Sequence, residues 1–478
     1  MKHYERIAEE LTRLIESRSF PPGARMPSVR GLSRAHTASP GTVLRAYALL
    51  EDRGLIAARP RSGYFVRSAH PQRLPEPSTR LPAAGEGPVD INDLVFHVLE
   101  SVKDRRVTPF GSAFPSPALF PFKALSAAFA AATRQLDPAR TVESLPPGNP
   151  ALRGWLSRRY LESGCVVEPD DIVITSGALE ALNLCLQAVT QPGDIVAVES
   201  PAFYGALQAI ETLGLHAVEV PTDPRYGVDV DALARILQTH PIRACWFMTS
   251  FQNPLGFQMP DDNKRALVAL LARHDVPLIE DDVYAELYLR GPRPTPAKAF
   301  DRKGLVLHCA SFSKSLAPGF RVGWVAPGRF RRQITRRQLT TTLATTAPTQ
   351  WAIVEYLRHG GFDRHLRGLR QTLMQQQCLM SDAIERHFPA GTRLSRPSGG
   401  YFLWVELPEA VDALDLHRRA TEAGVSVSPG PMFSAKRRYT NCLRLNYGHP
   451  DPEAIASGVQ CLGALLARGQ VPATPADA

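Results

Sequence analysis

The pattern of apolar and polar residues changes twice along the chain. Residues 1–68 contain short segments with apolar side chains at helical spacing, separated by turn-forming residues. Residues 69–104 begin with a run that is rich in proline and poor in large apolar residues, which is typical of a linker. Across residues 105–468, short β-branched runs alternate with longer helical patterns. We therefore expect a small N-terminal domain, a proline-rich linker and a large α/β domain.

The N-terminal part is predicted to hold three helices and a two-stranded ribbon. Residues 4–17 carry apolar side chains at helical spacing, and Ser28 is a good N-cap for a second helix. Ser39 is a good N-cap for a third helix. Residues 55–68 predict a hairpin whose turn lies near Gly63. This order is the outline of a winged helix-turn-helix.

The large part is predicted to contain a mainly parallel sheet. Six apolar runs indicate strands: DIVIT, DIVAVES, ACWFMTS, VPLIEDD, LVLHCAS and RVGWVA. Strands that alternate with helices favour parallel pairing, and ligands of such sheets bind at the carboxyl ends of the strands. Polar residues that follow these runs are therefore the first candidates for a binding site.

Composition indicates a globular protein with a basic N-terminal part. The 478 residues are 44% hydrophobic and 21% charged, as in folded proteins. The formal net charge is +9, and residues 1–70 hold twelve Lys or Arg against six Asp or Glu. A basic head on a nearly neutral body favours an anionic partner, with double-stranded DNA first. A chance surface bias is the alternative that charge alone leaves open.

The cysteines and the apolar runs bear on the compartment. Seven scattered cysteines without CxxC spacing indicate reduced thiols in a cytoplasmic protein, with neither a disulfide framework nor a metal site. The charged start MKHYERIAEE lacks the apolar core of a secretory signal. No uninterrupted run of about 18 apolar residues predicts a membrane span. We expect a cytoplasmic protein with no membrane partner.

Candidate DNA contacts follow from the order of the predicted helices. The third helix of a helix-turn-helix enters the major groove, and its first residues face base edges. Ser39, Thr42 and Arg45 occupy that part of the helix. Phosphate contacts are expected from Arg30 in the second helix and from Arg59 and Arg61 in the ribbon. Singly, each arginine is equally well an ordinary surface charge, so the prediction depends on their combination.

The stretch PPGARMPSVRGLSRAHTASPGTVLRAYALLEDRGLIAARPRSGYFV resembles the GntR-type winged helix-turn-helix over residues 1–67. The landmarks that match are PPG, PSVR, the TVLRAYALLEDRGLI run and RSGYFV. The resemblance implies DNA contacts from Ser28, Arg30, Ser39, Thr42, Arg61 and Gly63. Pro40 departs from the pattern, because many relatives have an arginine there, and we expect one phosphate or base contact fewer.

Lys314 lies between two serines in the apolar stretch HCASFSKSLAPGFRVGW, just after a predicted strand. Most lysines are simply solvated. A lysine at the end of a strand can also bind a carbonyl cofactor covalently. If that cofactor is pyridoxal 5'-phosphate, the chain must also supply an anion cradle, an acid for the pyridine nitrogen, donors to the phenolic oxygen and a ring stacker.

An anion cradle is predicted twice. In TSGALEAL, a helix begins directly after a strand, and its first backbone amides can bind an anion, or the run is a plain strand-to-helix turn. A second set of polar groups flanks Lys314 in sequence, and its arginine can make a bidentate contact. The candidates are the amides of Gly177, Ala178 and Leu179 and the side chains of Ser311, Ser313 and Arg321.

The remaining roles also have candidates at strand ends. Asp281 can keep the pyridine nitrogen protonated, whereas its neighbour Asp282 is a candidate N-cap. Asn253 and Tyr284 can donate to the phenolic oxygen. Phe203 can stack on the ring, although a core aromatic is equally plausible.

Arg444 stands in the apolar run NCLRLNYG. A buried arginine needs a partner, and either a substrate carboxylate or an internal salt bridge would serve.

Residues 105–468 resemble the fold-type I pyridoxal-phosphate aminotransferases, through the motifs SFSKSLAPGFRVGW, QNPLG, EDDVY, TSGALEAL and CLRLNYG. The resemblance implies an α/β fold in which Lys314 holds pyridoxal 5'-phosphate and Asp281 meets its pyridine nitrogen. It also implies that Asn253 and Tyr284 bind the phenolic oxygen and that Arg444 binds the substrate carboxylate. Phe203 and Leu255 depart from the pattern, because tyrosine or tryptophan and threonine are common at these positions.

A GntR-type head joined to an aminotransferase-like body is similar to the MocR subfamily of bacterial transcription regulators. That resemblance implies a homodimer that binds a DNA operator and senses a small-molecule effector, which is an amine, an amino acid or pyridoxal 5'-phosphate. Two alternatives stay open: a working aminotransferase with a DNA-binding appendage, and a DNA-binding protein whose body is only structural.

Overall fold

The computed structural model describes residues 2–17, 19–21, 23–52, 55–59, 62–66, 74–82, 85–101, 106–137 and 145–468. The chain forms two compact units, Met1–Arg73 and Leu74–Ala478, and each is described by itself.

The first unit has the helices and the ribbon that its sequence predicts. It consists of α1 (His3–Glu16), α2 (Val29–Ala35), α3 (Pro40–Asp52) and the antiparallel pair β1 (Ile56–Arg59) and β2 (Gly63–Val66). The Ser28 hydroxyl accepts the Gly31 amide at 3.0 Å, and the Ser39 hydroxyl accepts the Thr42 amide at 3.1 Å. Both predicted N-caps are therefore confirmed. Apolar faces of the three helices close over a core that includes Tyr47.

The second unit is organised around a nine-stranded sheet. Its strand order is β3 (Gly87–Pro88), β7 (His216–Asp223), β6 (Ile195–Ser200), β9 (Ile242–Phe247), β10 (Leu278–Asp281), β11 (Val306–Ser311), β12 (Gly323–Ala326) and β5 (Val173–Thr175), and β8 (Gly227–Val228) pairs with β7. The strands from β7 to β11 are parallel, and β12 runs antiparallel to both of its neighbours. All six predicted strands are confirmed, and the fold class is the α/β class that the sequence indicates. β7 was not predicted.

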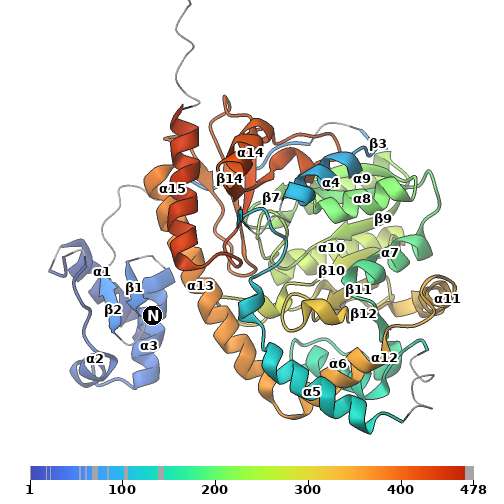
Figure 1. The fold of residues 1–478 in the computed structure, drawn as a ribbon, viewed down its shortest axis with the longest axis horizontal. Helices are drawn as coiled ribbons and strands as arrows, with labels where there is room; N and C mark the ends of the chain where they lie inside the picture. The colour runs from blue at the N-terminus through green and yellow to red at the C-terminus, as the bar shows by residue number, and fades with distance from the viewer. Residues whose placement is uncertain are drawn as a thin grey trace, which may run out of the picture. The chain divides into compact units, whose positions relative to one another are not determined.

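Helices surround this sheet, as Figure 1 shows. They are α4 (Asn92–Ser101), α5 (Phe122–Gln135), α6 (Pro150–Leu161), α7 (Ala178–Val189), α8 (Tyr204–Thr212), α9 (Val230–Thr239), α10 (Asp261–His274), α11 (Arg331–Thr341) and α12 (Ala347–Arg358). The long helix α13 (Gly361–His387) then leads into a smaller C-terminal part and packs against its last helix, α15 (Pro452–Arg468).

The C-terminal part has a four-stranded sheet of its own. Its strands are β13 (Arg393–Leu394), β14 (Phe402–Glu406), β17 (Cys442–Asn446) and β16 (Ser428–Pro429), joined by α14 (Ala413–Glu422). A short parallel pair, β4 (Thr108–Pro109) with β15 (Val425–Ser426), brings an earlier stretch of the chain to this sheet. The segment that follows β4 therefore lies beside β17.

Residues 74–101 lie within the range expected to be a linker. Where they are described, they pack on the rest of the second unit. Arg80 forms an ion pair with Glu406 at 2.8 Å, and β3 pairs with the edge strand β7. Val95 and Val98 of α4 are buried in the main apolar cluster of the large sheet. This proline-rich stretch therefore makes specific contacts and buries apolar side chains.

Candidate functional site

Lys314 follows β11, and its amine lies beside one backbone carbonyl and one aromatic ring. The amine donates to the carbonyl of Ala113 at 2.8 Å and lies 3.8 Å from the centre of the Phe114 ring. Burial lowers the pKa of Lys314 to about 7, with the charge of Arg444 adding to the effect and that of Asp281 opposing it. At neutral pH a large fraction of this amine is therefore uncharged, which makes it a nucleophile.

Asp281 ends β10, the strand next to β11 in the sheet. Its side chain is only 1% exposed, and its Oδ1 atom has no hydrogen-bond partner among the described residues. Burial and the neighbouring charge of Asp282 raise the pKa of Asp281 to about 7, while Lys314 and His308 lower it. A buried carboxylate oxygen without a donor is suited to the N–H of a protonated ring nitrogen.

Asn253 and Tyr284 are buried on neighbouring loops. The amide oxygen of Asn253 accepts a hydrogen bond from Arg444 Nη1 at 3.2 Å. Its Nδ2 has no partner in the part of the chain that the structure describes. Burial raises the pKa of Tyr284, so its phenol stays protonated and able to donate. Both groups can therefore serve as donors to one anionic oxygen.

The first turn of α7 and the loop after Lys314 meet through Arg321. Gly177 has a φ of +91°, and a Cβ atom there would lie 2.6 Å from Nη2 of Arg321. The guanidinium donates to the hydroxyl of Ser313 at 3.2 Å and to the carbonyl of Ser176 at 3.5 Å. The Ser311 hydroxyl in turn accepts the Ser313 amide at 3.3 Å. The two predicted halves of the anion cradle are thus one cluster.

The three amides of the predicted cradle differ in their present partners. The amide of Gly177 donates to the carbonyl of Thr175 at 2.8 Å. The amides of Ala178 and Leu179 belong to the first helical turn and have no carbonyl four residues back within the helix. These two amides remain candidates, and the value of Gly177 is the space that it leaves for Arg321.

Arg444 lies in β17 and is completely buried. Its Nη2 donates to the carbonyls of Gly111 and Ser112 at 2.9 and 3.2 Å and to the hydroxyl of Ser428 at 2.9 Å. Its Nε has no partner, and no acidic side chain pairs with it among the described residues. Burial lowers its pKa. The internal salt bridge that the sequence left open is therefore not found there, and the guanidinium meets neutral acceptors and the ring of Phe402, whose centre lies 4.2 Å from its carbon atom.

A segment that the sequence did not reveal contacts both Lys314 and Arg444. Four consecutive carbonyls, from Gly111 to Phe114, accept hydrogen bonds from side chains of the site. Asn446 donates to Ser112 and Phe114, and Tyr401 donates to Ala113. We call residues 111–114 the carbonyl segment. Its sequence, GSAF, has no charged or titratable side chain, so chemistry-bearing residue types gave no signal for it.

Phe203 is the N-cap of α8, directly after β6. Its ring lies 4.9 Å from that of Tyr204, and a Cβ atom at Gly205 would lie 2.6 Å from it. The ring packs against both apolar clusters of the second unit and is only partly buried. A stacking role and a packing role are both compatible with this position.

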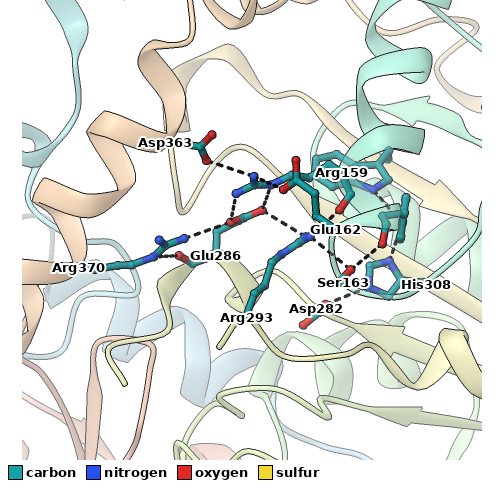
Figure 2. A network of polar contacts seen from close by, with 11 residues as sticks. Arg159, Glu162, Ser163, Asp282, Glu286, Arg293, His308, Asp363 and Arg370 are labelled. Atoms are coloured by element: carbon teal, nitrogen blue, oxygen red, sulfur yellow. Dashed lines mark hydrogen bonds and ion pairs between the residues drawn. The ribbon is translucent and has the colours of Figure 1, made fainter. Parts of the chain in front are cut away.

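Asp282 is not the N-cap that was considered for it. Its Oδ2 lies 3.0 Å from His308 Nε2, and Tyr284 is the residue at the cap position of the next short helix. Nearby, Glu286 binds three arginines: Arg159 through both oxygens at 2.8 Å, Arg293 at 3.2 Å and Arg370 at 3.3 Å. Figure 2 shows this network, which joins the loop after β10 to α6 and α13.

The predicted DNA contacts differ in their positions and in their hydrogen bonds. Ser28 and Ser39 cap helices, as described above, and Thr42 shares a hydrogen bond with Ser39 at 2.9 Å. The side chains of Arg30 and Arg45 are exposed, and Gly63 has a φ of +95° in the turn of the ribbon. Arg61 and the side chain of Arg59 lie outside the described residues.

Three further observations concern chemistry elsewhere in the chain. All seven cysteines are free thiols. No cluster of three or more His, Cys, Asp or Glu residues suited to a metal ion occurs within the described ranges. Among the helices that the structure describes, none combines the length and the apolar character that crossing a bilayer requires.

Comparisons with known proteins match the two units to two families. The family of aminotransferases class I and II matches residues 120–460, and the gntR family of bacterial regulatory proteins matches residues 3–66. An uncharacterized HTH-type transcriptional regulator of Escherichia coli strain K12, YdcR, is 47% identical over 98% of this chain and 99% of its own length. Its K12 counterpart YjiR is 39% identical over 98% of this chain and 99% of its own.

Solved structures match the second unit. The α-aminoadipate aminotransferase LysN from Thermus thermophilus, complexed with N-(5'-phosphopyridoxyl)-L-leucine, is 30% identical with a TM-score of 0.71. The match covers 78% of this chain and 94% of that one. These neighbours have the fold-type I architecture that the body motifs predict.

Proposed function

The chain belongs to the MocR subfamily of GntR-type transcription regulators, and on that premise we propose that its aminotransferase-like unit is a ligand sensor dependent on pyridoxal 5'-phosphate. Its ligand is an amine, an amino acid or the cofactor itself. Its response is a change in how the GntR-type head binds operator DNA. We further propose that the protein acts as a homodimer in the bacterial cytoplasm, because two heads can bind two half-sites.

One observation carries the cofactor proposal: two buried polar atoms, Asp281 Oδ1 and Asn253 Nδ2, have no partner within the described ranges, and they accompany an amine with a lowered pKa. They are an acceptor and a donor, as the pyridine nitrogen and the phenolic oxygen require. Lys314 would hold the cofactor covalently, and the cluster around Arg321 would hold its phosphate. When bound, the cofactor supplies a carbonyl that captures amines reversibly.

Arg444 supports a carboxylate on the ligand. A fully buried guanidinium that meets only neutral acceptors is electrostatically unsatisfied. A carboxylate would neutralise it with a charge-assisted hydrogen bond at the unpaired Nε. This favours amino acids over simple amines as the ligands that enter the site.

The head supports contact with duplex DNA. α3 begins with small residues, and exposed Arg45 lies on its outer surface. These features are suited to a helix that enters the major groove while arginines meet phosphates. For a ligand in the body to alter this contact, it must bind two arrangements of the dimer with unequal affinity.

The test combines a spectrum with a footprint. Purified protein incubated with pyridoxal 5'-phosphate should gain visible absorption, and borohydride should fix the cofactor to Lys314, as located by mass spectrometry. Lys314→Ala should lose both signals, and a footprint on the protein's own upstream DNA should change when an amino acid is added. Protein that stays colourless and carries no adduct would refute the proposal.

Transaminase activity is measured in the same preparation. The lowered pKa of Lys314 allows its amine to move protons as well as to bind a carbonyl. Steady turnover of an amino acid with a keto acid, without any change in the footprint, would favour the enzyme over the sensor.

A further inference from the structure

A buried chain of four polar side chains lies behind Asp281. The indole nitrogen of Trp324 donates to the Tyr160 hydroxyl at 3.0 Å, and that hydroxyl lies 2.7 Å from Nδ1 of His308. Nε2 of His308 lies 3.0 Å from Oδ2 of Asp282. All four side chains are buried, and they come from α6, β11, β12 and the end of β10. The proposed function leaves this chain without a role.

The donors and acceptors of the chain fix its direction. Trp324 can only donate, so the oxygen of Tyr160 accepts that hydrogen bond. That oxygen has a second lone pair, but the assignment in which an unprotonated Nδ1 of His308 accepts is the one that also gives the buried phenolic proton of Tyr160 a partner. Nε2 of His308 consequently carries the ring proton and donates it to Asp282. The result is a neutral imidazole whose Nε2–H group donates to Oδ2 of Asp282.

Asp282 and Asp281 are consecutive at the carboxyl end of β10. The Asp282 amide donates to the carbonyl of Cys309 at 2.9 Å, which fixes the backbone between the two carboxylates. Asp282 is 5% exposed and Asp281 1%. Two like charges this close interact strongly, because little water screens them. A charge kept on Asp282 therefore makes Asp281 a stronger base.

A small cavity adjoins the chain. Its lining includes Tyr160, His308, Asp282, Glu286 and Arg293. Oδ1 of Asp282 and Nε of Arg293 are both buried without a protein partner in the described chain. A cavity of this size has room for about one water molecule, which can accept from Arg293 and donate to Asp282. That water would give Asp282 a second donor and favour its ionised form.

We propose that Tyr160, His308 and Asp282 are positioning residues that keep a negative charge behind Asp281 and so strengthen its hold on a protonated ring nitrogen. The inference rests on the proposed function for its purpose. The effect of the Asp282 charge on the titration of Asp281 can be measured without cofactor.

Other charges also act on this pair and are present in wild type and variant alike, and among them Lys314 titrates in the same pH range as Asp281. The titratable and charged groups near Asp281 and Asp282 from the surrounding elements are Glu199, Lys264, Glu280, Tyr284, Glu286, Arg293, Cys309 and Lys314.

The first experiment uses the cofactor-free full chain. Carbon NMR of selectively labelled aspartate follows the titration of the Asp281 carboxyl group in wild type and in Asp282→Asn. The substitution removes one negative charge and preserves the shape of the side chain. We expect the midpoint of Asp281 to fall by roughly one pH unit. Nitrogen NMR of His308 should show the Nε2–H tautomer.

The control is Glu219→Gln, which neutralises a carboxylate that is equally buried, on β7, three strands away from β10. Glu219 accepts hydrogen bonds from Ser200 and Ser434, so its substitution also perturbs the core. We expect Glu219→Gln to leave the Asp281 midpoint in place. An Asp282→Asn shift no larger than the control, or the Nδ1–H tautomer of His308, would overturn the proposal.

The second experiment uses protein loaded with pyridoxal 5'-phosphate and follows its absorption against pH. His308→Leu removes the donor to Asp282, whereas His308→Gln restores an N–H group. We expect the pH midpoint of the absorption change that reports protonation of the ring nitrogen to shift downward by roughly one pH unit in His308→Leu. In His308→Gln this midpoint should return most of the way to the wild-type value. Equal behaviour of the two variants contradicts a positioning role. Absence of any cofactor spectrum in wild type refutes the proposed function and leaves the Asp281 titration as the test.

Discussion

Replacing Gly177 by alanine tests whether the phosphate cradle depends on the space that this glycine leaves. The residue has φ +91° and ψ 170°, a conformation almost restricted to glycine. An added Cβ would also lie 2.6 Å from Nη2 of Arg321. The side chain of Arg321 must then move away from the first turn of α7.

Two costs follow, and they are separable. Backbone strain of about 1–3 kcal/mol lowers the free energy of unfolding. Displacement of Arg321 removes a charged hydrogen bond to the phosphate, worth about 1.5–3 kcal/mol, and weakens the binding of pyridoxal 5'-phosphate about 10- to 100-fold. Pyridoxal, which lacks the phosphate, should lose little affinity.

The assay compares Gly177→Ala with Gly193→Ala. Gly193 has φ +89°, but a Cβ atom there meets nothing within 4 Å. Both variants should unfold at lower urea concentration than wild type, and only Gly177→Ala should bind pyridoxal 5'-phosphate poorly. Equal cofactor affinity in the two variants, by spectral titration, would refute the cradle.

Three further predictions concern charge. Asp281 has a pKa of about 7 in the folded protein against 3.8 unfolded, so the stability it gives to the cofactor-free protein is lost as pH rises from about 4 to 7, and urea unfolding of Asp281→Asn should lack this loss. Glu286→Gln breaks a buried cluster and should lower the free energy of unfolding by about 3–5 kcal/mol, against less than about 1 kcal/mol for Asp363→Asn at the exposed edge. Arg45→Ala should weaken operator binding and reduce its salt dependence by about one ion, whereas Arg235→Ala on α9 should leave gel-shift titrations unchanged.

The head was predicted from sequence because its signals are local. Ser28 and Ser39 cap helices through amides three residues ahead, and such contacts depend on neighbouring residues alone. The strand β7 was missed because Pro221 interrupts its run and Glu219 is a charged residue within it. Glu219 is tolerated there because residues more than 200 positions later, at 434 and 435, donate to it.

The candidate site was predicted in part because the positions of several of its residues follow from local sequence patterns. Lys314, Asp281 and Asn253 stand at strand ends, and parallel strands bring their carboxyl ends to one edge. The partners of Arg444 and the role of His308 depend on contacts between distant residues, which no local spacing encodes. The hydrogen bond from the Gly177 amide to Thr175 likewise depends on the turn that the chain actually adopts.

The carbonyl segment implies that a ligand must replace hydrogen bonds that the side chains of the site already make. Lys314 and Arg444 already donate to the carbonyls of residues 111–113. An incoming group that takes over these donors therefore replaces hydrogen bonds, and the net gain is limited to neutralising Arg444 and to a hydrogen bond at its Nε, which has no partner among the described residues. Occupancy should then follow changes in ligand concentration promptly in both directions.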